Sequence, residues 1–340
     1  MKQTLKIIFI NGLIVVLFFE CLIGILLAVP SLSQGPLYRF MSAFYRYDNI
    51  RMPQYEEAMS LYDSELTYTL KPNATFYFSN PEFNTKFTTN SQGLRDTETS
   101  LQEPEIICIG DSYTMGWGVE QQEAFPQVLS SLTGKSILNA GVSSYGSVRE
   151  MKLLDRLDTS NLRYLIIQYD GNDYPENNVF YNTTELPIMN NSTYNDVKKI
   201  YRNRIRYYPG KHFLFALVYL KGVITKTPIS RPRVRTYFRK EQKSKSSETQ
   251  AFLNALMNAS SVDLTKVQLL FFASKKFINE LKDEVNKSPY PDYIKNALYV
   301  PKPTKYKYPE FHFIIDGHLN AKGHAFIAKQ IAQKLNLTTN

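Results

Sequence analysis

Four short polar blocks along the chain contain residue types that acyl chemistry requires. The first is Gly110-Asp111-Ser112, which follows the apolar run Glu-Ile-Ile-Cys-Ile at residues 105–109. A continuous apolar run of this kind is typical of a buried parallel strand, so Ser112 is predicted to lie where the strand ends and a helix begins. Ligands of open α/β sheets bind at that edge, and a helix amino terminus favours a developing oxyanion. Ser112 is therefore a candidate nucleophile, provided that a base can reach it.

The other three blocks also follow short apolar runs. Residues 137–141 form one run and end in Gly141, and residues 164–167 lead toward Gly171-Asn172-Asp173. Near the carboxyl terminus, residues 313–315 precede Asp316-Gly317-His318. If each run is a strand of one parallel sheet, the polar residues that follow the runs meet at one edge. The sequence therefore predicts that His318 lies beside Ser112, although the two residues are far apart in the chain.

The order and content of these blocks resemble those of the SGNH (GDSL-type) hydrolases, a family named for its Ser, Gly, Asn and His blocks. The resemblance implies that Ser112 is the nucleophile, His318 the general base and Asp316 the residue that orients the histidine. It also implies an oxyanion hole formed by the backbone N–H groups of Ser112 and Gly141 and the side-chain amide of Asn172. This division of labour is that of other serine–histidine–acid sites.

Two further features bear on the resemblance. Many family members place two residues between the aspartate and the histidine, whereas only Gly317 separates Asp316 from His318. A backbone carbonyl is the alternative partner for the histidine. Residues 90–96 (Asn-Ser-Gln-Gly-Leu-Arg-Asp) are similar to a stretch that precedes the serine block in membrane-anchored SGNH relatives. On residue types alone, this stretch is a turn in which Gly93 supplies a positive φ.

Each block residue also has an ordinary structural interpretation. A serine after a strand is usually a helix N-cap, Asn172 suits a turn, and Asp173 suits a helix cap. Asp316, His318 and His324 raise the question of a metal site, but no second cluster with metal-ligand spacing accompanies them. The sequence thus indicates neither a metal nor another cofactor. The joint occurrence of four ordered blocks is what favours the catalytic interpretation.

The amino-terminal segment predicts a membrane anchor. Residues 7–29 are almost entirely apolar and long enough to cross a bilayer as a helix. Lys2 and Lys6 precede them, so the positive-inside rule predicts that everything after Pro30 is extracytoplasmic, in the periplasm or outside the cell. A cleaved signal peptide is the alternative, although its apolar core should be shorter. Glu20 is costly inside a bilayer and is expected to face another helix, to lie near the outer interface, or to contact a membrane-protein partner.

Residue patterns divide the chain into the anchor at 1–30, a neck with short strands at 31–103, and a hydrolase domain at 104–340. After Glu65, alternating β-branched and aromatic residues predict short antiparallel strands. From residue 105 strands alternate with helical stretches, which predicts an α/β fold with a parallel sheet. The resemblance implies a flavodoxin-like three-layer α/β/α SGNH-hydrolase fold after the transmembrane helix. We predict a fourth strand at 266–273 and helices at 124–132, 148–157, 274–285 and 320–335.

Residues 174–262 form an expected insertion between the third and fourth strands, and they carry the positive charge of the chain. From Lys198 to Lys245 there are 15 Lys and Arg residues and one acid, so the remainder of this +9 chain has a net charge of about −5. Three interpretations remain open: a solvated lid, a surface on anionic lipid headgroups, or a grip on an acidic polysaccharide. The extracytoplasmic placement argues against nucleic acid as the partner.

The favoured function from sequence is a serine esterase that removes O-acyl groups, acetyl above all, from an envelope glycan or a related small ester. An O-acyltransferase that uses the same residues to acetylate a polysaccharide is one alternative, because both reactions pass through one acyl-enzyme. A non-catalytic glycan-binding or assembly subunit is another, motivated by Glu20 and the basic insertion.

Overall fold

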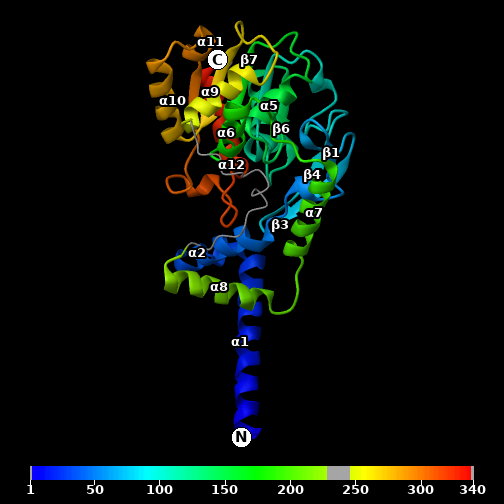
Figure 1. Ribbon diagram of the computed structural model, residues 1–340, viewed down its shortest axis with the longest axis vertical. Helices are drawn as coiled ribbons and strands as arrows, with labels where there is room; N and C mark the ends of the chain where they lie inside the picture. Colours follow the sequence, from blue (N-terminus) through cyan, green and yellow to red (C-terminus); the bar gives the residue numbers. More distant parts are fainter. Residues whose placement is uncertain (1, 228–245, 338–340) are drawn as a thin grey trace.

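The computed structural model describes residues 2–227 and 246–337. A rounded α/β domain stands at one end of a long helix, α1 (Lys2–Ala28), and two shorter helices lie across the junction (Figure 1). These are α2 (Gly35–Phe44) and α8 (Lys211–Thr225). Helix α1 is long and apolar enough to cross a membrane, by its length and composition.

The domain is built on one sheet of five strands in the order β6-β5-β7-β8-β9, in which every neighbouring pair is parallel. This order is the doubly wound, flavodoxin-like arrangement. The first strand, β5, lies inside the sheet, β6 is added on one side of it, and the later strands are added on the other side. The fold class predicted from the sequence is therefore confirmed. The strands are β5 (Ile106–Gly110), β6 (Ile137–Gly141), β7 (Tyr164–Gln168), β8 (Gln268–Ala273) and β9 (Leu298–Pro301).

Alternate residues of the strands face two helical layers. Ile107 and Ile109 of β5 belong to the larger apolar core, whereas Ile106 and Cys108 face the opposite side. Burial on both faces explains why these strands read as continuous apolar runs rather than alternating ones. The larger core is covered by α5 (Ser147–Leu154), α6 (Tyr174–Thr183), α9 (Glu248–Asn258) and α10 (Lys275–Lys287), and the smaller by α4 (Phe125–Thr133) and α12 (Ala321–Lys334).

The remaining described elements are short or lie outside the layers. They are the helices α3 (Ser112–Met115), α7 (Asn191–Ile205) and α11 (Asp292–Lys295), the π-helical turn η2 (Tyr45–Asn49), and the 3₁₀ turns η1 (Pro30–Leu32), η3 (Pro53–Tyr55), η4 (Thr99–Leu101), η5 (Gln121–Glu123) and η7 (Pro309–Phe311).

One predicted strand is wrong. Residues 313–315, which precede Asp316, form a loop, and the fifth strand of the sheet is β9 instead. The backbone N–H groups of Ile314 and Ile315 donate to the side-chain carboxylate of Glu82 rather than to a neighbouring strand. A side chain thus satisfies backbone groups that a sheet ladder would otherwise have to pair.

The expected insertion does not form one body. Helices α6 and α9 belong to the layer over the sheet, and Phe252 and Leu253 of α9 are fully buried in the larger core. Helix α8 instead packs against α1 and α2 at the junction, so the insertion contributes to two separate parts of the molecule. Seven of its fifteen basic residues fall in residues 228–245, outside the described residues.

The region before the domain forms two antiparallel hairpins, as the sequence predicts. Their strands are β1 (Ser60–Asp63) with β2 (Thr67–Leu70), and β3 (Thr75–Asn80) with β4 (Phe83–Thr88). The motif at residues 90–96 follows them. Gly93 has φ +74°, and a Cβ there would lie 2.3 Å from the Leu70 carbonyl oxygen, so the turn requires glycine. Asp96 accepts a hydrogen bond of 2.7 Å from the backbone N–H of Asn139 in β6, which ties the motif to the sheet.

Arg95 of this motif is fully buried and holds the loop that follows α3. Its guanidinium lies 3.7 Å from the ring centroid of Phe87 and donates to four backbone carbonyls. The distances are 2.6 Å to Gly116, 2.7 Å to Val119, 3.1 Å to Lys86 and 3.3 Å to Met115. Burial lowers the pKa of Arg95 to about 9. The motif therefore supports the backbone beside Ser112.

We predict that Arg95→Met lowers the free energy of unfolding by about 3 kcal/mol or more, because several buried carbonyls lose their donor. Urea unfolding followed by the fluorescence of Trp117, the single tryptophan, measures this change. Arg163→Met is the matched control, since Arg163 is 66% exposed and pairs with Glu105 at 3.7 Å. Its effect should stay within about 0.5 kcal/mol. Equal unfolding midpoints for the two variants would contradict the role given to Arg95.

Candidate active site

Ser112 lies at the turn between β5 and α3. Gly110 ends the strand with φ +155°, and a Cβ there would lie 2.2 Å from Thr114 Oγ1. Only glycine therefore allows this turn. Asp111 caps α3 by accepting a hydrogen bond of 3.1 Å from the backbone N–H of Tyr113. The local sequence thus sets Ser112 as the first residue of the helix, at the carboxyl edge of the sheet.

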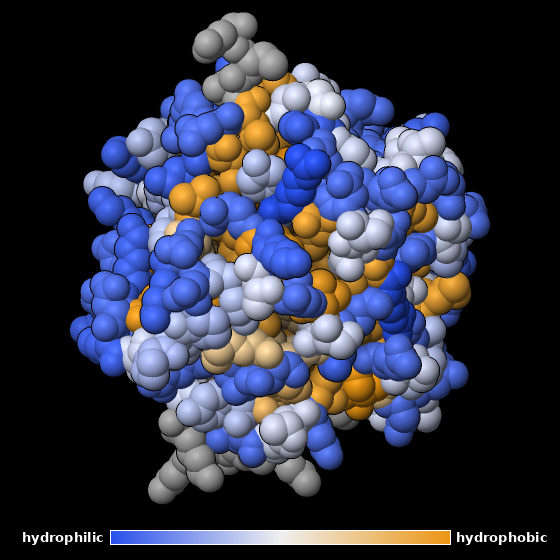
Figure 2. All heavy atoms as spheres, turned by 90° about the horizontal axis from the view of Figure 1, so that it is seen from above, coloured by the Kyte–Doolittle hydropathy of each residue, from blue (hydrophilic) through white to orange (hydrophobic). Residues whose placement is uncertain are grey.

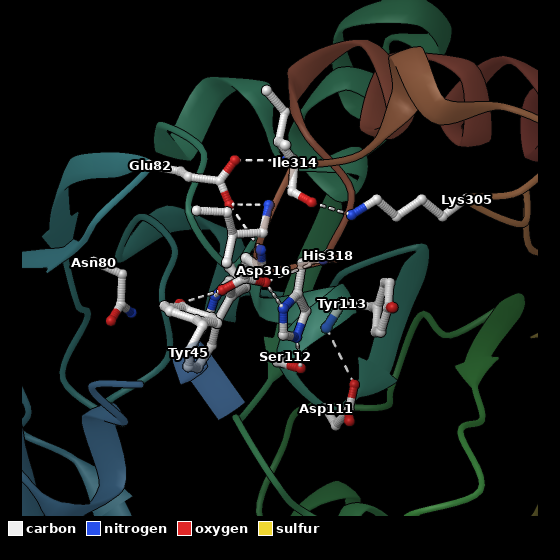
Figure 3. Close-up of polar contacts among 12 residues, drawn as sticks. Tyr45, Asn80, Glu82, Asp111, Ser112, Tyr113, Lys305, Ile314, Asp316 and His318 are labelled. Carbon is white, nitrogen blue, oxygen red and sulfur yellow. Dashed lines mark hydrogen bonds and ion pairs between the residues drawn. The ribbon is translucent and has the colours of Figure 1, made fainter. Parts of the chain in front are cut away.

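His318 lies within reach of this serine. Ser112 Oγ and His318 Nε2 are 2.9 Å apart, although 206 positions separate the two residues in the chain (Figure 3). The imidazole stacks on the indole ring of Trp117, with ring centroids 4.7 Å apart and an interplanar angle of 17°. The ring of Tyr113 lies 5.0 Å away on a 40° tilt. Aromatic packing therefore fixes the plane of the histidine ring.

Asp316 contacts the other side of the imidazole. Its Oδ1 atom pairs with His318 Nδ1 and also accepts a hydrogen bond of 3.1 Å from the backbone N–H of His318. Gly317 has φ +89°, a conformation that turns the chain sharply, so a single intervening residue is enough. The carboxylate, rather than a backbone carbonyl, is thus the partner of the histidine.

The second oxygen of Asp316 is also engaged. Oδ2 accepts hydrogen bonds from the hydroxyl of Tyr45 and, at 2.9 Å, from Trp117 Nε1. The side chain is only 1% exposed. Burial disfavours the charged form, but the charge of His318 and the hydrogen bonds from His318 and Tyr45 prevail and lower the pKa of Asp316 to about 2. The carboxylate therefore stays ionised at neutral pH and orients the Nδ1–H of the imidazole.

Glu82, at the tip of the β3–β4 hairpin, holds the loop that carries Asp316. Its carboxylate accepts hydrogen bonds from the backbone N–H groups of Ile314, Ile315 and Asp316, the last two at 2.7 Å (Figure 3). Burial raises the pKa of Glu82, while these three donors act in the opposite direction. A residue from the first part of the chain therefore positions the acid of the site.

The three predicted oxyanion donors, Ser112, Gly141 and Asn172, differ in the partners of their N–H groups. The backbone N–H of Ser112 has no hydrogen-bond acceptor among the described residues. Asn172 lies at the same edge, and its Nδ2 donates one hydrogen to Asp111 Oδ2 at 3.0 Å, whereas an amide nitrogen carries two.

Gly141 does not fit the role that the resemblance implies. Its N–H lies within β6 and donates at 3.0 Å to Oδ1 of Asn139, two residues earlier on the same strand. The structure therefore brings Ser112, Asn172, Asp316 and His318 together, while the Gly141 N–H is engaged elsewhere.

One charged pair beside the serine was not expected from the sequence. Lys302, at the end of β9, forms an ion pair with Asp170 and lies 4.0 Å from the ring centroid of Tyr113. Burial raises the pKa of Asp111, and the charge of Asp170 adds to that effect. The ion pair borders the edge at which Asn172 lies.

The fold and the site together define an α/β protein with a serine–histidine–aspartate constellation at the carboxyl edge of a parallel sheet. Within that class, the ordered blocks resemble those of the SGNH (GDSL-type) hydrolases, apart from the single residue that separates Asp316 from His318.

No family model matches the chain, and no curated protein does. Among solved structures, a G-D-S-L-family protein from Desulfitobacterium hafniense DCB-2, described as lipolytic, is 10% identical, with 67% of this chain and 97% of that chain covered and a TM-score of 0.38. A GDSL-like lipase from Bacteroides ovatus ATCC 8483 is 12% identical, with 74% of this chain and 57% of that chain covered and a TM-score of 0.34. An acetyl xylan esterase from Butyrivibrio proteoclasticus is 11% identical, with 68% of this chain and 64% of that chain covered and a TM-score of 0.34.

We predict that Tyr45→Phe lowers kcat about tenfold and leaves KM nearly unchanged, because a hydrogen bond to a charged group is worth roughly 1.5–3 kcal/mol. Removing the hydroxyl also raises the pKa of Asp316, so activity is lost at a higher pH on the acid side. The measurement is the pH dependence of kcat for p-nitrophenyl acetate. Tyr77→Phe, at a side chain that is 62% exposed, is the control. Identical profiles for both variants would refute the positioning role of Tyr45.

We also predict that Asn172→Ala lowers kcat by roughly 10²–10³-fold, the usual effect of losing one oxyanion donor. Steady-state kinetics with the same ester measure it. Asn161→Ala is the control, since the Asn161 amide donates to the Glu103 carbonyl and precedes β7, at the opposite end of that strand from Asn172. A loss of less than threefold in Asn172→Ala would remove Asn172 from the site.

Proposed function

We propose that the protein is a membrane-anchored serine ester hydrolase with an extracytoplasmic catalytic domain. The observation that carries the proposal is the 2.9 Å separation of Ser112 Oγ and His318 Nε2, with Asp316 on the opposite ring nitrogen. A nucleophile, a base and an orienting acid in this geometry support acyl transfer through a covalent intermediate.

The reaction begins with attack of Ser112 Oγ on the ester carbonyl carbon, while His318 Nε2 takes the hydroxyl proton. Asp316 stabilises the imidazolium, and the Ser112 N–H and the Asn172 amide stabilise the oxyanion. Collapse of the tetrahedral intermediate breaks the bond to the alcohol oxygen, which receives the proton from Nε2. Water then attacks the acyl-enzyme with His318 again acting as base, and the carboxylic acid and free Ser112 are released.

We propose acetyl as the acyl group and an O-acetylated envelope glycan as the substrate class. The proposed extracytoplasmic placement of the domain brings the site to the compartment in which such glycans are found.

The catalytic proposal is tested with the full chain in lipid nanodiscs and a fluorophosphonate probe. We expect covalent labelling of the wild type and of Ser131→Ala, a serine exposed on α4, and loss of labelling in Ser112→Ala. Mass spectrometry of the labelled peptide should locate the adduct at Ser112. An unlabelled wild type would favour the non-catalytic alternative.

The proposed substrate and the hydrolytic outcome need a separate test. We expect the full chain to release acetate from an O-acetylated glycan oligomer, and to release acetate from p-nitrophenyl acetate whether or not a glycan acceptor is present. Acetate that appears only on added glycan would instead assign an O-acyltransferase. That result would leave the roles of Ser112, His318 and Asp316 unchanged.

A further inference from the structure

Helix α8 exposes an apolar face that the domain does not cover. Lys211, His212, Phe215 and Ala216 are buried on its inner side. Large apolar side chains on its other side are between 38% and 70% exposed: Leu214, Leu217, Val218, Leu220, Val223 and Ile224. By contrast, polar side chains predominate and apolar ones are interspersed on the end of the domain remote from α1 (Figure 2). A concentration of this kind on one short helix marks an interaction surface.

This face is continuous with the anchor, because α8 is attached to α1 through Glu20. The Glu20 carboxylate accepts hydrogen bonds from the backbone N–H of His212 at 3.0 Å and from the Tyr207 hydroxyl at 2.8 Å. It also lies 3.2 Å from His212 Nδ1. The carboxylate thus satisfies the amino terminus of α8, where backbone N–H groups lack helical partners. The expectation that Glu20 faces another helix is met by a helix of the same chain.

The level of this contact along α1 indicates where α8 lies. Glu20 is eight residues before the end of α1 at Ala28, or about 12 Å at 1.5 Å per residue. Amphipathic helices that lie in the membrane plane bury their apolar face about 5–10 Å into the boundary between headgroups and acyl chains. Helix α8 crosses α1 rather than running along it (Figure 1). Its direction is that of a helix in that plane, and its contact with α1 lies near the end of α1 that adjoins the catalytic domain.

The ends of α8 carry residues suited to the interface. Tyr207 and Tyr208 precede the helix and are 57% and 47% exposed, and tyrosine is enriched at the level of lipid headgroups. Lys221 and Lys226 are exposed near its carboxyl end, where long cationic side chains can extend to the headgroups.

We infer that α8 is an interfacial helix whose exposed face is covered by lipid acyl chains in the leaflet on the side of the catalytic domain. The inference rests on the proposed membrane anchoring by α1. A second copy of the chain or a partner protein would need to displace lipid from a surface that continues directly from a membrane-spanning helix.

The position of α8 affects the candidate active site. Phe215 on the inner face of α8 packs against Phe44 of α2, with ring centroids 5.0 Å apart. Ile315 of the catalytic loop belongs to the same apolar cluster, and Tyr45, the residue after Phe44, binds Asp316. Packed side chains therefore connect the lipid-facing helix with the catalytic loop. They hold Ser112 at a fixed height above the bilayer, where it can act on esters presented at the membrane surface.

The test is the depth of spin labels on the full chain in nanodiscs. Labels are placed singly at Leu217 on α8, Leu132 on α4 and Leu13 on α1, in a Cys21→Ser background, because Cys21 is exposed and Cys108 is buried. For each label, the ratio of its collision rate with oxygen to its collision rate with an aqueous nickel complex is measured. We expect this ratio to be several-fold higher for the Leu217 label than for the Leu132 label. Fluorophosphonate labelling of each variant checks that the fold is retained.

Two results would overturn the inference. A Leu217 label as accessible to nickel as the Leu132 label would place α8 in water, and protection from both reagents would place a protein on this face. The Leu13 label separates this failure from failure of the anchor, since it should report the bilayer interior in either case. A nickel-accessible Leu13 label would instead contradict membrane anchoring itself.

Discussion

The site depends on one buried carboxylate that remains charged. Asp316 is almost inaccessible to water, and an isolated charge in that position would be strongly unfavourable. Three side chains compensate it, in addition to the backbone N–H of His318: the imidazole of His318, the indole N–H of Trp117 and the hydroxyl of Tyr45. Each comes from a different part of the chain, so the charge is stable only when the catalytic loop, the loop after α3 and the neck are assembled. The orientation of His318, the general base, therefore depends on contacts from several parts of the fold.

The residues of the site come both from the parallel sheet and from elements outside it. The parallel sheet supplies Ser112 and Asn172 at the ends of β5 and β7, which lie side by side where the strand order reverses. The hairpin at β3–β4 contributes Glu82, which holds the catalytic loop in place of a strand. The neck contributes Tyr45 from a segment packed on α8 and α1. Helices α1, α2 and α8 thus take part in the geometry of the site through this segment.

The sequence predicted the framework well, and it predicted the supporting groups poorly. Continuous apolar runs located four of the five strands, because strands buried on both faces have a strong compositional signal. The short strand β9 has no such run, and residues 313–315 have one although they form a loop. Ser112, Asp316 and His318 could be found because they sit in short motifs. Tyr45, Glu82 and Lys302 act through contacts across the fold, and nothing in their neighbours along the chain indicates a role.

The contacts of Asp316 favour one tautomer of His318, with the proton on Nδ1 and an unprotonated Nε2 facing Ser112. Nitrogen NMR of the full chain, labelled with ¹⁵N only at its four histidines, measures this directly. The resonance of His318 is assigned by its loss in His318→Gln. At a pH where the enzyme is active, we predict a protonated Nδ1 and an unprotonated Nε2, and a mixture of both tautomers in Asp316→Ala. A neutral ring protonated at Nε2 in the wild type would contradict the account.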